Sequence, residues 1–176
     1  YKIVGKGGRL LTYGQSQQFM FEYKSASPEQ TALLAKKIAD IIQPGTVICL
    51  NGDLGAGKTL FVQNLAKALG VQGDVTSPTF NLMNIYEGRI SIFHFDLYRL
   101  EQEYELEEIG FYDYVEEPEG LVLIEWAEKF EDCLPENYIS LKIQRTEQEQ
   151  QRILRFELVG QELENVYKEM EALCQF

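Results

Sequence analysis

One stretch of the sequence has the residue types and the spacing of a phosphate-binding loop. Residues 52–59 read GDLGAGKT and fit the pattern G-x-x-x-x-G-K-[ST] at every fixed position. Glycines let such a loop curl so that its amides face phosphate oxygens, and the N-terminus of the following helix adds partial positive charge. Lys58 would reach the β- and γ-phosphates, and the Thr59 hydroxyl would bind Mg²⁺. The residues predicted to hold the nucleotide here are Asp53, Leu54, Gly55, Ala56, Gly57, Lys58, Thr59 and Leu60.

Two acidic residues stand where they could serve this nucleotide. Asp96 ends the apolar segment 89–95, and Glu125 ends the apolar segment 121–124. A carboxylate at the end of a buried strand is costly unless a cation or hydrogen-bond donors satisfy it. Nucleotide hydrolases need an acid on the magnesium side and a group that orients the attacking water. We predict that both acids belong to the site; the alternative for either one is a helix cap or an ion pair with a nearby basic residue.

Other candidate residues have a functional and a structural interpretation. Thr76, Ser77 and Thr79 follow the helix after the loop, where segments that close on a γ-phosphate often lie, but they also fit an ordinary proline turn. Trp126 could stack on a base or a partner, whereas a lone aromatic side chain at a strand end more often packs. His94 is the sole histidine, which excludes a histidine-rich metal site and favours a structural role.

The surrounding segments supply the strand, loop and helix that these residues require. Ser27 and Pro28 start a helix, Pro44 and Gly45 end it, and the apolar periodicity of the segments predicts an α/β fold. We predict a single P-loop NTPase domain with a central mixed, mostly parallel sheet flanked by helices, with antiparallel strands added. The predicted strands are residues 19–23, 46–50, 81–86, 89–95, 121–126, 138–143 and 153–159; the helices follow residue 27, at 60–69 and near 163–173.

Composition limits the functions that fit this chain of 176 residues. A net charge of -12 opposes unaided binding to nucleic acid, so we expect no direct contact with nucleic acid by the chain alone. Three cysteines lack metal-ligand spacing and argue against a disulfide framework, and no apolar run approaches the ~18 residues of a membrane span. We expect a soluble, cytoplasmic protein. The acid-dense residues 101–119 predict a short helix and a loop with a solvated face, or a docking site for a partner.

The first 19 residues differ in composition from the rest. They contain Lys2, Lys6 and Arg9 among glycines and glutamines, while the first acid is Glu22 and the first methionine is Met20. We therefore expect residues 1–19 to be an added leader or expression tag and residues 20–176 to form the ATPase domain. A natural basic extension is the alternative.

Five motifs, in this order and at these intervals, resemble one family. GDLGAGKT, TSPTF, HFDLYR, LEEIGF and IEW look like the TsaE family, also called YjeE, over about residues 20–143. The resemblance implies a weak ATPase, with ATP and Mg²⁺, that serves biosynthesis of threonylcarbamoyladenosine on tRNA. It also implies association with the proteins TsaD and TsaB. TsaD performs the transfer to adenosine, and the ATP cycle of the family protein resets the complex.

Matching the family motifs to this sequence implies roles for individual residues. The resemblance implies catalytic roles for Lys58, Asp96 and Thr79, and magnesium binding by Thr59 and Glu125; the order of the two acids could be reversed. Trp126 is placed in the nucleotide site. Two other functions remain open: a P-loop kinase of a small molecule or nucleoside, and a nucleotide-gated binding module that does not hydrolyse ATP. The arginines form no evident kinase lid, and no N-K-x-D motif indicates a GTPase.

Overall fold

The computed structural model describes residues 2–4, 10–12, 19–76, 78 and 81–175. Strands β1 (Lys2–Val4) and β2 (Leu10–Thr12) pair with each other in a sheet of their own, whereas all later strands form one sheet. The later strands are β3 (Met20–Ser25), β4 (Val47–Asn51), β5 (Met83–Glu87), β6 (Ser91–Asp96), β7 (Leu121–Glu125), β8 (Tyr138–Arg145) and β9 (Arg152–Val159). The helices are α1 (Pro28–Ile41), α2 (Lys58–Ala68), α3 (Tyr104–Glu108), α4 (Phe111–Val115), the 3₁₀ helix η2 (Ala127–Cys133) and α5 (Glu164–Leu173).

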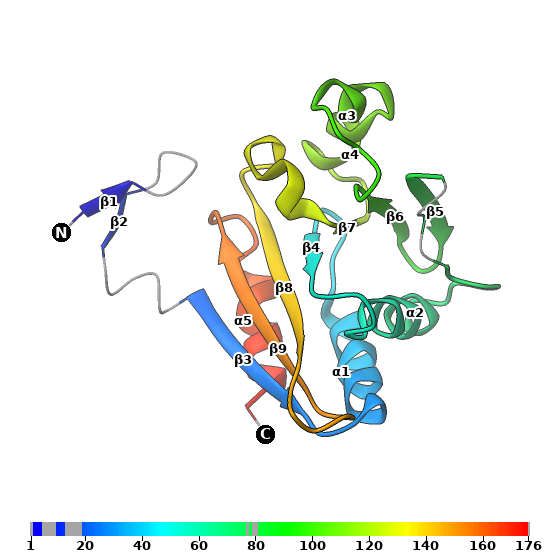
Figure 1. Cartoon of the computed structure of the whole chain (residues 1–176), viewed down its shortest axis with the longest axis vertical. Coiled ribbons are helices and arrows are strands. Elements are labelled where there is room, and N and C mark those ends of the chain that lie inside the picture. Colours follow the sequence, from blue (N-terminus) through cyan, green and yellow to red (C-terminus); the bar gives the residue numbers. More distant parts are fainter. Residues whose placement is uncertain (1, 5–9, 13–18, 77, 79–80, 176) are drawn as a thin grey trace.

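The main sheet is mixed, with parallel strands at its centre. Its order is β3-β9-β8-β4-β7-β6-β5, and the pairs β8–β4, β4–β7 and β7–β6 are parallel (Figure 1). Strands β5 and β9 run against their neighbours. Strand β3 runs against β9 and therefore points the same way as the central four. The predicted architecture, a mostly parallel sheet with antiparallel strands added, is confirmed.

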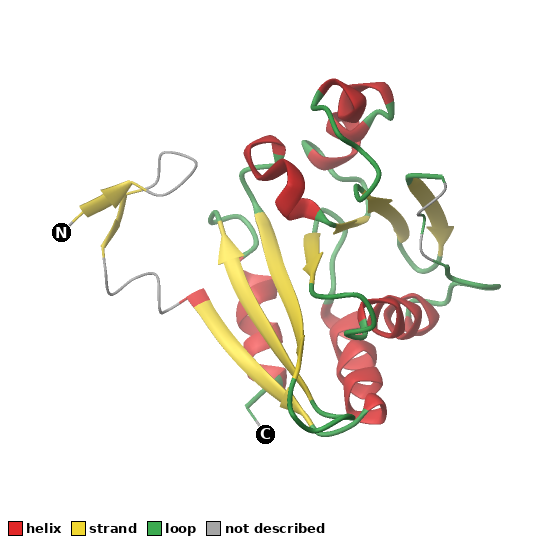
Figure 2. Ribbon diagram, viewed as in Figure 1, coloured by secondary structure: helices red, strands yellow, loops and turns green. Residues whose placement is uncertain are grey.

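Helices cover both faces of this sheet because side chains alternate along its strands. On β4, Ile48 and Leu50 pack into a core with α1, α2 and α5, while Val47 and Cys49 pack into a second core with α3, α4 and η2. All four side chains are buried. A strand buried on both faces reads as a continuous apolar run, which is what residues 47–50 show. Figure 2 shows α1 and α2 on one side of β4, β7 and β6, and α3 and α4 on the other.

The first helix begins where the sequence indicates. The Ser27 side chain accepts the backbone N–H of Gln30 at 3.2 Å, and Pro28 occupies the first turn. The Gln30 side chain accepts the backbone N–H of Ala26 at 2.8 Å, so the cap is reciprocal, as in a capping box. The acid-dense segment differs from its prediction. It forms two short helices instead of one because Gly110, with φ of 73°, separates α3 from α4.

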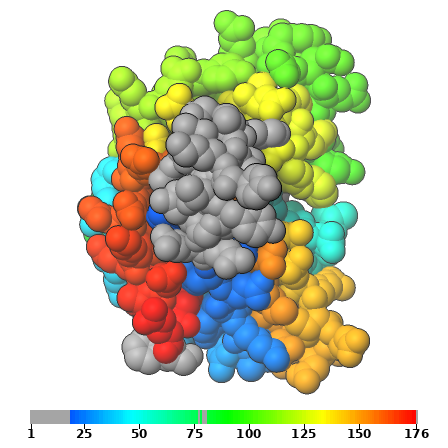
Figure 3. Space-filling model, turned by 90° about the vertical axis from the view of Figure 1, so that its left-hand side faces the viewer, coloured from blue at the N-terminus to red at the C-terminus, as the bar shows by residue number. Residues whose placement is uncertain are grey.

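The C-terminal helix closes the end of the sheet that carries β3. Phe21 of β3 stacks on Phe156 of β9 with ring centroids 4.7 Å apart, and Tyr167 of α5 lies 5.3 Å from Phe21. In Figure 3 the red segment of α5 lies beside the blue segment of β3. Helix α5 thus extends the core formed with α1. In the described part of the chain, every helix is too short or too polar to cross a membrane.

The parallel strands end at a common edge, and this edge positions the site. Strand β4 leads into the phosphate-loop segment, β7 ends at Glu125, and β6 ends at Asp96. Glu125 is in register with Leu50 on one side and with Asp96 on the other. In open α/β sheets, ligands bind outside the carboxyl ends of the strands. The predicted acids and the predicted loop therefore meet at one edge of the sheet.

Candidate functional site: a phosphate loop facing two buried acids

The loop between β4 and α2 has the backbone shape that its glycines permit. Gly52 has φ of 140° and Gly57 has φ of 115°, both in the region that favours glycine. A Cβ atom at Gly52 would overlap the carbonyl oxygen of Ile143 on β8, so no larger residue fits there. Helix α2 follows directly, and its first backbone bond runs from the N–H of Phe61 to the oxygen of Gly57 at 3.0 Å. The loop therefore places the N-terminus of helix α2 at the edge of the sheet where the parallel strands end.

Lys58 is folded over this loop and is largely shielded from solvent. Its Nζ atom donates to the carbonyl oxygen of Gly52 at 2.8 Å and lies 4.7 Å from the centroid of the Trp126 ring. Only 7% of the residue is exposed. An ammonium held against an aromatic face gains cation–π stabilisation. The predicted phosphate-binding lysine and the tryptophan after β7 are thereby brought into contact.

The two predicted acids lie side by side and are buried. Asp96 is 4% exposed and Glu125 is 5% exposed. The Oδ1 atom of Asp96 accepts the backbone N–H of Tyr98 at 3.0 Å. The Oε2 atom of Glu125 lies 2.8 Å from Nε2 of His94. Glu125 stands on the strand next to β4, whereas Asp96 stands one strand further away, so the two carboxylates differ in their position relative to the loop.

The loop and the acids enclose a hollow of about 420 Å³. Of the predicted residues, the loop members Asp53, Ala56 and Leu60 are outside its wall, although they belong to the same loop and helix start. Thr79 and Ser77 fall outside the described residues. Tyr98 is an unpredicted member of the wall. The lining residues are Leu54, Gly55, Gly57, Lys58, Thr59, Asp96, Tyr98, Glu125 and Trp126.

Trp126 has an unusual backbone that turns its side chain into this hollow. Its φ of 60° is positive, which is uncommon for a residue with a bulky side chain and is associated with functional sites. The indole ring lies 4.8 Å from the Tyr98 ring, between centroids. Lys129 lies behind Tyr98 and donates to the carbonyl oxygens of Tyr98 and Leu100. The aromatic pair thus forms one side of the hollow.

Residues that sequence reasoning missed support the site from outside its wall. Arg145 donates to the carbonyl oxygen of Gly55 at 3.0 Å, and Arg152 donates to that of Ala56 at 2.9 Å. They face each other at the end of the β8–β9 pair. His94 was expected to be structural; it is indeed buried, but it also contacts the predicted site residue Glu125. The only sequence signal for the arginines is their place at the two ends of the turn between two predicted strands.

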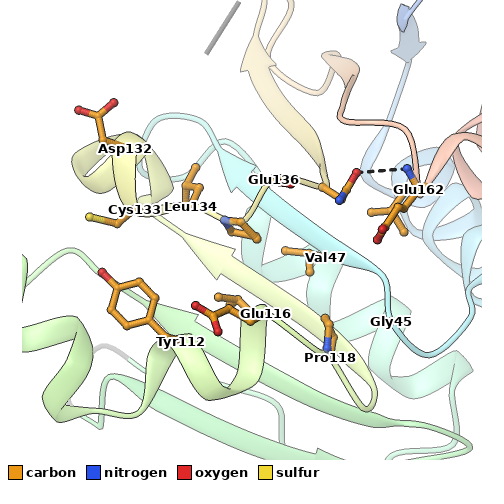
Figure 4. A pocket seen from close by; sticks show the side chains of 14 residues that line it. Gly45, Val47, Tyr112, Glu116, Pro118, Asp132, Cys133, Leu134, Glu136 and Glu162 are labelled. Carbon is orange, nitrogen blue, oxygen red and sulfur yellow. Dashed lines mark hydrogen bonds between the residues drawn. The ribbon is translucent and has the colours of Figure 1, made fainter. Parts of the chain in front are cut away.

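A second hollow, of about 560 Å³, opens at the other end of β4, near Gly45 and Val47 (Figure 4). Its wall carries carboxylates, including Glu116 and Glu136, and none of its lining residues is a lysine or arginine. Burial and a hydrogen bond with Cys133 raise the pKa of Tyr112 in this wall to about 12. The phosphate loop is absent from the wall, and the charge here is unsuited to a phosphate ligand.

The first hollow combines groups of opposite charge around one space. A buried ammonium and a helix N-terminus favour an anion, while two carboxylates and a hydroxyl favour a hard cation. Among the described residues, no three His, Cys, Asp or Glu side chains gather to hold a metal ion. A polyphosphate with Mg²⁺ has this combination of charges.

Comparisons with known proteins show the family of this chain and agree with its fold. A family profile described as "Threonylcarbamoyl adenosine biosynthesis protein TsaE" matches residues 25–154. The tRNA threonylcarbamoyladenosine biosynthesis protein TsaE of Bacillus subtilis is 36% identical over 150 residues, covering 85% of this chain and 92% of the relative. That of Treponema pallidum is 38% identical over 119 residues, covering 68% and 87%.

The fold also matches a solved structure. The crystal structure of YdiB from Bacillus subtilis superimposes with a TM-score of 0.71 at 31% sequence identity, covering 87% of this chain and 95% of that one. The family profile spans most of the chain and includes the loop, both acids and Trp126. The chain therefore belongs to the TsaE family.

Proposed function

We propose that this protein is a magnesium-dependent, ATP-binding protein with weak ATPase activity that supports threonylcarbamoyladenosine modification of tRNA. The role in tRNA modification is supported by the names of its relatives, which are tRNA threonylcarbamoyladenosine biosynthesis proteins. The observation that carries the nucleotide part is the hollow in which Lys58, the start of α2 and two buried carboxylates converge. A glycine-rich loop of this kind serves phosphate binding in other proteins.

The residues of the hollow fit MgATP by their chemistry. Lys58 and the loop amides would hold the phosphates, and Thr59 with Glu125 would hold the ion. Magnesium, when bound, would neutralise charge on the phosphates. Glu125 is the better candidate for the ion because it stands on the strand adjacent to β4. Asp96, one strand further away, is left to orient the attacking water or to sense the state of the nucleotide.

The contact between Lys58 and Trp126 offers a way to detect nucleotide binding. In the structure the Lys58 ammonium is held by the Gly52 oxygen and the indole face. A phosphate would compete for the same ammonium, so nucleotide binding should change the environment of Trp126. The chain has a single tryptophan, so its fluorescence reports on this site alone.

We further propose that TsaD and TsaB are the partners and that ATP hydrolysis resets their complex. Support comes from the family and from the net charge of -12, which disfavours direct binding to tRNA by this chain. Dependence on a partner would also explain weak activity in isolation, since a partner can order a catalytic segment. The proposal leaves the transfer reaction itself to TsaD.

Phosphate release from ATP and Mg²⁺, with water as the sole acceptor, tests this function. We expect slow release by the protein alone and strong stimulation when a TsaB–TsaD complex is added. The matched control is Asp96→Asn, which keeps an oxygen for the Tyr98 amide but removes the charge. It should bind nucleotide and release little phosphate.

The other outcomes of this test favour the two remaining functions. Nucleotide binding without hydrolysis, alone and with the complex, would favour a nucleotide-gated binding module. Phosphate transfer that appears only when small alcohols or nucleosides are supplied would favour a kinase. Absence of any change in Trp126 fluorescence with ATP would contradict the nucleotide site itself.

A further inference from the structure

The outer side of the phosphate loop is held by two arginines that lie far from it in the sequence. Arg145 donates to the Gly55 oxygen at 3.0 Å and, at 3.4 Å, to the Leu54 oxygen. Arg152 donates through Nε to the Ala56 oxygen at 2.9 Å. The guanidinium groups thus reach three consecutive carbonyl oxygens of the loop. Neither arginine is among the residues that line the hollow.

Holding a carbonyl fixes the direction of the amide that follows it. A trans peptide is planar, so the C=O of one residue and the N–H of the next point in opposite directions. The peptide held by Arg152 at the Ala56 oxygen carries the N–H of Gly57, and the Leu54 oxygen belongs to the peptide that carries the N–H of Gly55. Gly55 and Gly57 line the hollow, whereas Ala56 does not.

The amide of Ala56 is already used within the loop. It donates to the Asp53 oxygen at 3.0 Å, which closes a turn. This leaves the Gly55 and Gly57 amides for a ligand, and these belong to peptides whose oxygens the arginines contact. A Cβ atom at Gly55 would overlap Nη2 of Arg145, so the guanidinium group lies directly against this glycine.

We propose that Arg145 and Arg152 are positioning residues that hold the amides of the phosphate loop toward the phosphates of the nucleotide. This inference rests on the proposed nucleotide function and adds the residues that prepare the loop for it. Bonds from charged donors to backbone oxygens are stronger than neutral ones. Three such bonds, from the end of one strand pair, would keep the loop in its binding shape before the nucleotide arrives.

The two arginines should differ in importance. Arg145 is exposed, so water competes for its donors, whereas Arg152 is partly buried. Arg152 also donates to the backbone oxygens of Glu149 and Gln151, which fixes its own side chain at the hairpin turn. We therefore expect the larger effect from Arg152.

The experiment compares Arg152→Gln, Arg145→Gln and the double variant with Arg155→Gln. Arg155 is the matched control. It lies on β9 like Arg152, its side chain is about half exposed, and it pairs with Glu22 instead of the loop. Arg152→Lys serves as the conservative variant, since it keeps the charge but loses the fork of donors.

The first readout needs no nucleotide. Hydrogen–deuterium exchange of a peptide that covers residues 53–60 should become faster in Arg152→Gln and fastest in the double variant, and it should be unchanged in Arg155→Gln. Exchange in residues 146–151 is followed separately, so that loosening of the hairpin turn is distinguished from loosening of the loop. Unchanged exchange at residues 53–60 in the double variant would overturn the proposal.

The second readout is the affinity for pyrophosphate and for ADP, measured by calorimetry. We expect Arg152→Gln to weaken both by about ten- to a hundredfold, the size of losing one charge-assisted bond that positions the loop. Arg152→Lys should recover part of this loss. Faster exchange at residues 53–60 combined with unchanged affinity would overturn the proposal, because the bonds would then be merely structural.

The same measurements separate this inference from the proposed function. If the unaltered protein binds ADP and pyrophosphate and the double variant binds them equally well, only the positioning role fails. If the unaltered protein binds neither ligand, the proposed function fails and the positioning role fails with it. In the double variant, KM for ATP should rise more than kcat falls. The reason is that the arginines would affect binding of the ground state and of the transition state alike.

Discussion

The buried contact between His94 and Glu125 predicts a measurable coupling between these two side chains. Their Nε2 and Oε2 atoms lie 2.8 Å apart, and the residues are 2% and 5% exposed. Water therefore cannot replace a partner that is removed. We consider His94→Leu, Glu125→Met and the double variant, which remove each polar group and then both.

The size of the effect follows from the burial of the pair. A hydrogen bond to a charged group contributes about 1.5–3 kcal/mol. His94→Leu leaves one carboxylate oxygen without its donor, so we expect a loss of about 2–4 kcal/mol in the free energy of unfolding. The double variant should lose less than the sum of the two single variants. The coupling energy should be about 2 kcal/mol.

The double-mutant cycle also corrects for the second ring nitrogen of His94, Nδ1. Within the described structure Nδ1 of His94 has no hydrogen-bond partner, so His94→Leu removes one unsatisfied polar atom as well as one bond. That gain occurs in both the single and the double variant and cancels from the coupling energy. The coupling thus isolates the His94–Glu125 contact.

Urea unfolding of the four proteins measures this coupling from their midpoints at a common m-value. A second cycle on Arg155 and Glu22 provides the control, because that pair is about half exposed and should couple by less than about 1 kcal/mol. A His94–Glu125 coupling below about 0.5 kcal/mol would refute the reasoning, since distant sites add to within that margin.

Three further predictions concern the site and the fold. Asp96→Asn should lower ATP turnover at least ~100-fold while leaving the urea midpoint nearly unchanged; a near-normal rate of phosphate release would remove Asp96 from the site. Gly52→Ala should lower the free energy of unfolding by about 2–5 kcal/mol, because φ is 140° and the new methyl group would meet the Ile143 oxygen; calorimetric melting checks this. Burial and nearby acids raise the pKa of Tyr138 from 10.0 to about 12, so its neutral form is favoured on folding and its contribution to stability is lost as the pH rises from 10 through 12. Tyr138→Phe should flatten the fall in urea midpoint over that pH range, and an unchanged slope would contradict the assigned cause.

Local patterns in the sequence were sufficient to predict much of the fold. The cap at Ser27, the glycines of the phosphate loop and the alternating apolar residues depend on neighbours only a few positions away. The ends of β6 and β7 were also predictable, because each strand runs from apolar residues to one acid. Parallel strands bring their carboxyl ends together, which is why Asp96 and Glu125 could be assigned to one site.

Other features depend on contacts between distant parts of the chain. His94 and Glu125 are 31 positions apart, and Arg145 lies 90 positions from Gly55. No periodicity links such residues, since their proximity follows from the order of strands in the sheet. The sequence also left open which acid stands next to the strand that leads into the phosphate loop.

By itself, therefore, the sequence determined the chemistry available and the local shapes that carry it: a phosphate loop, acids at strand ends and helices with defined starts. Only the tertiary structure decided which groups meet. The order β8-β4-β7-β6 sets Glu125 beside β4, places His94 against Glu125, and brings the end of the β8–β9 pair to the outer side of the loop. The physical reason is that side-chain contacts across a sheet are fixed by strand order and register, which no short segment of sequence encodes.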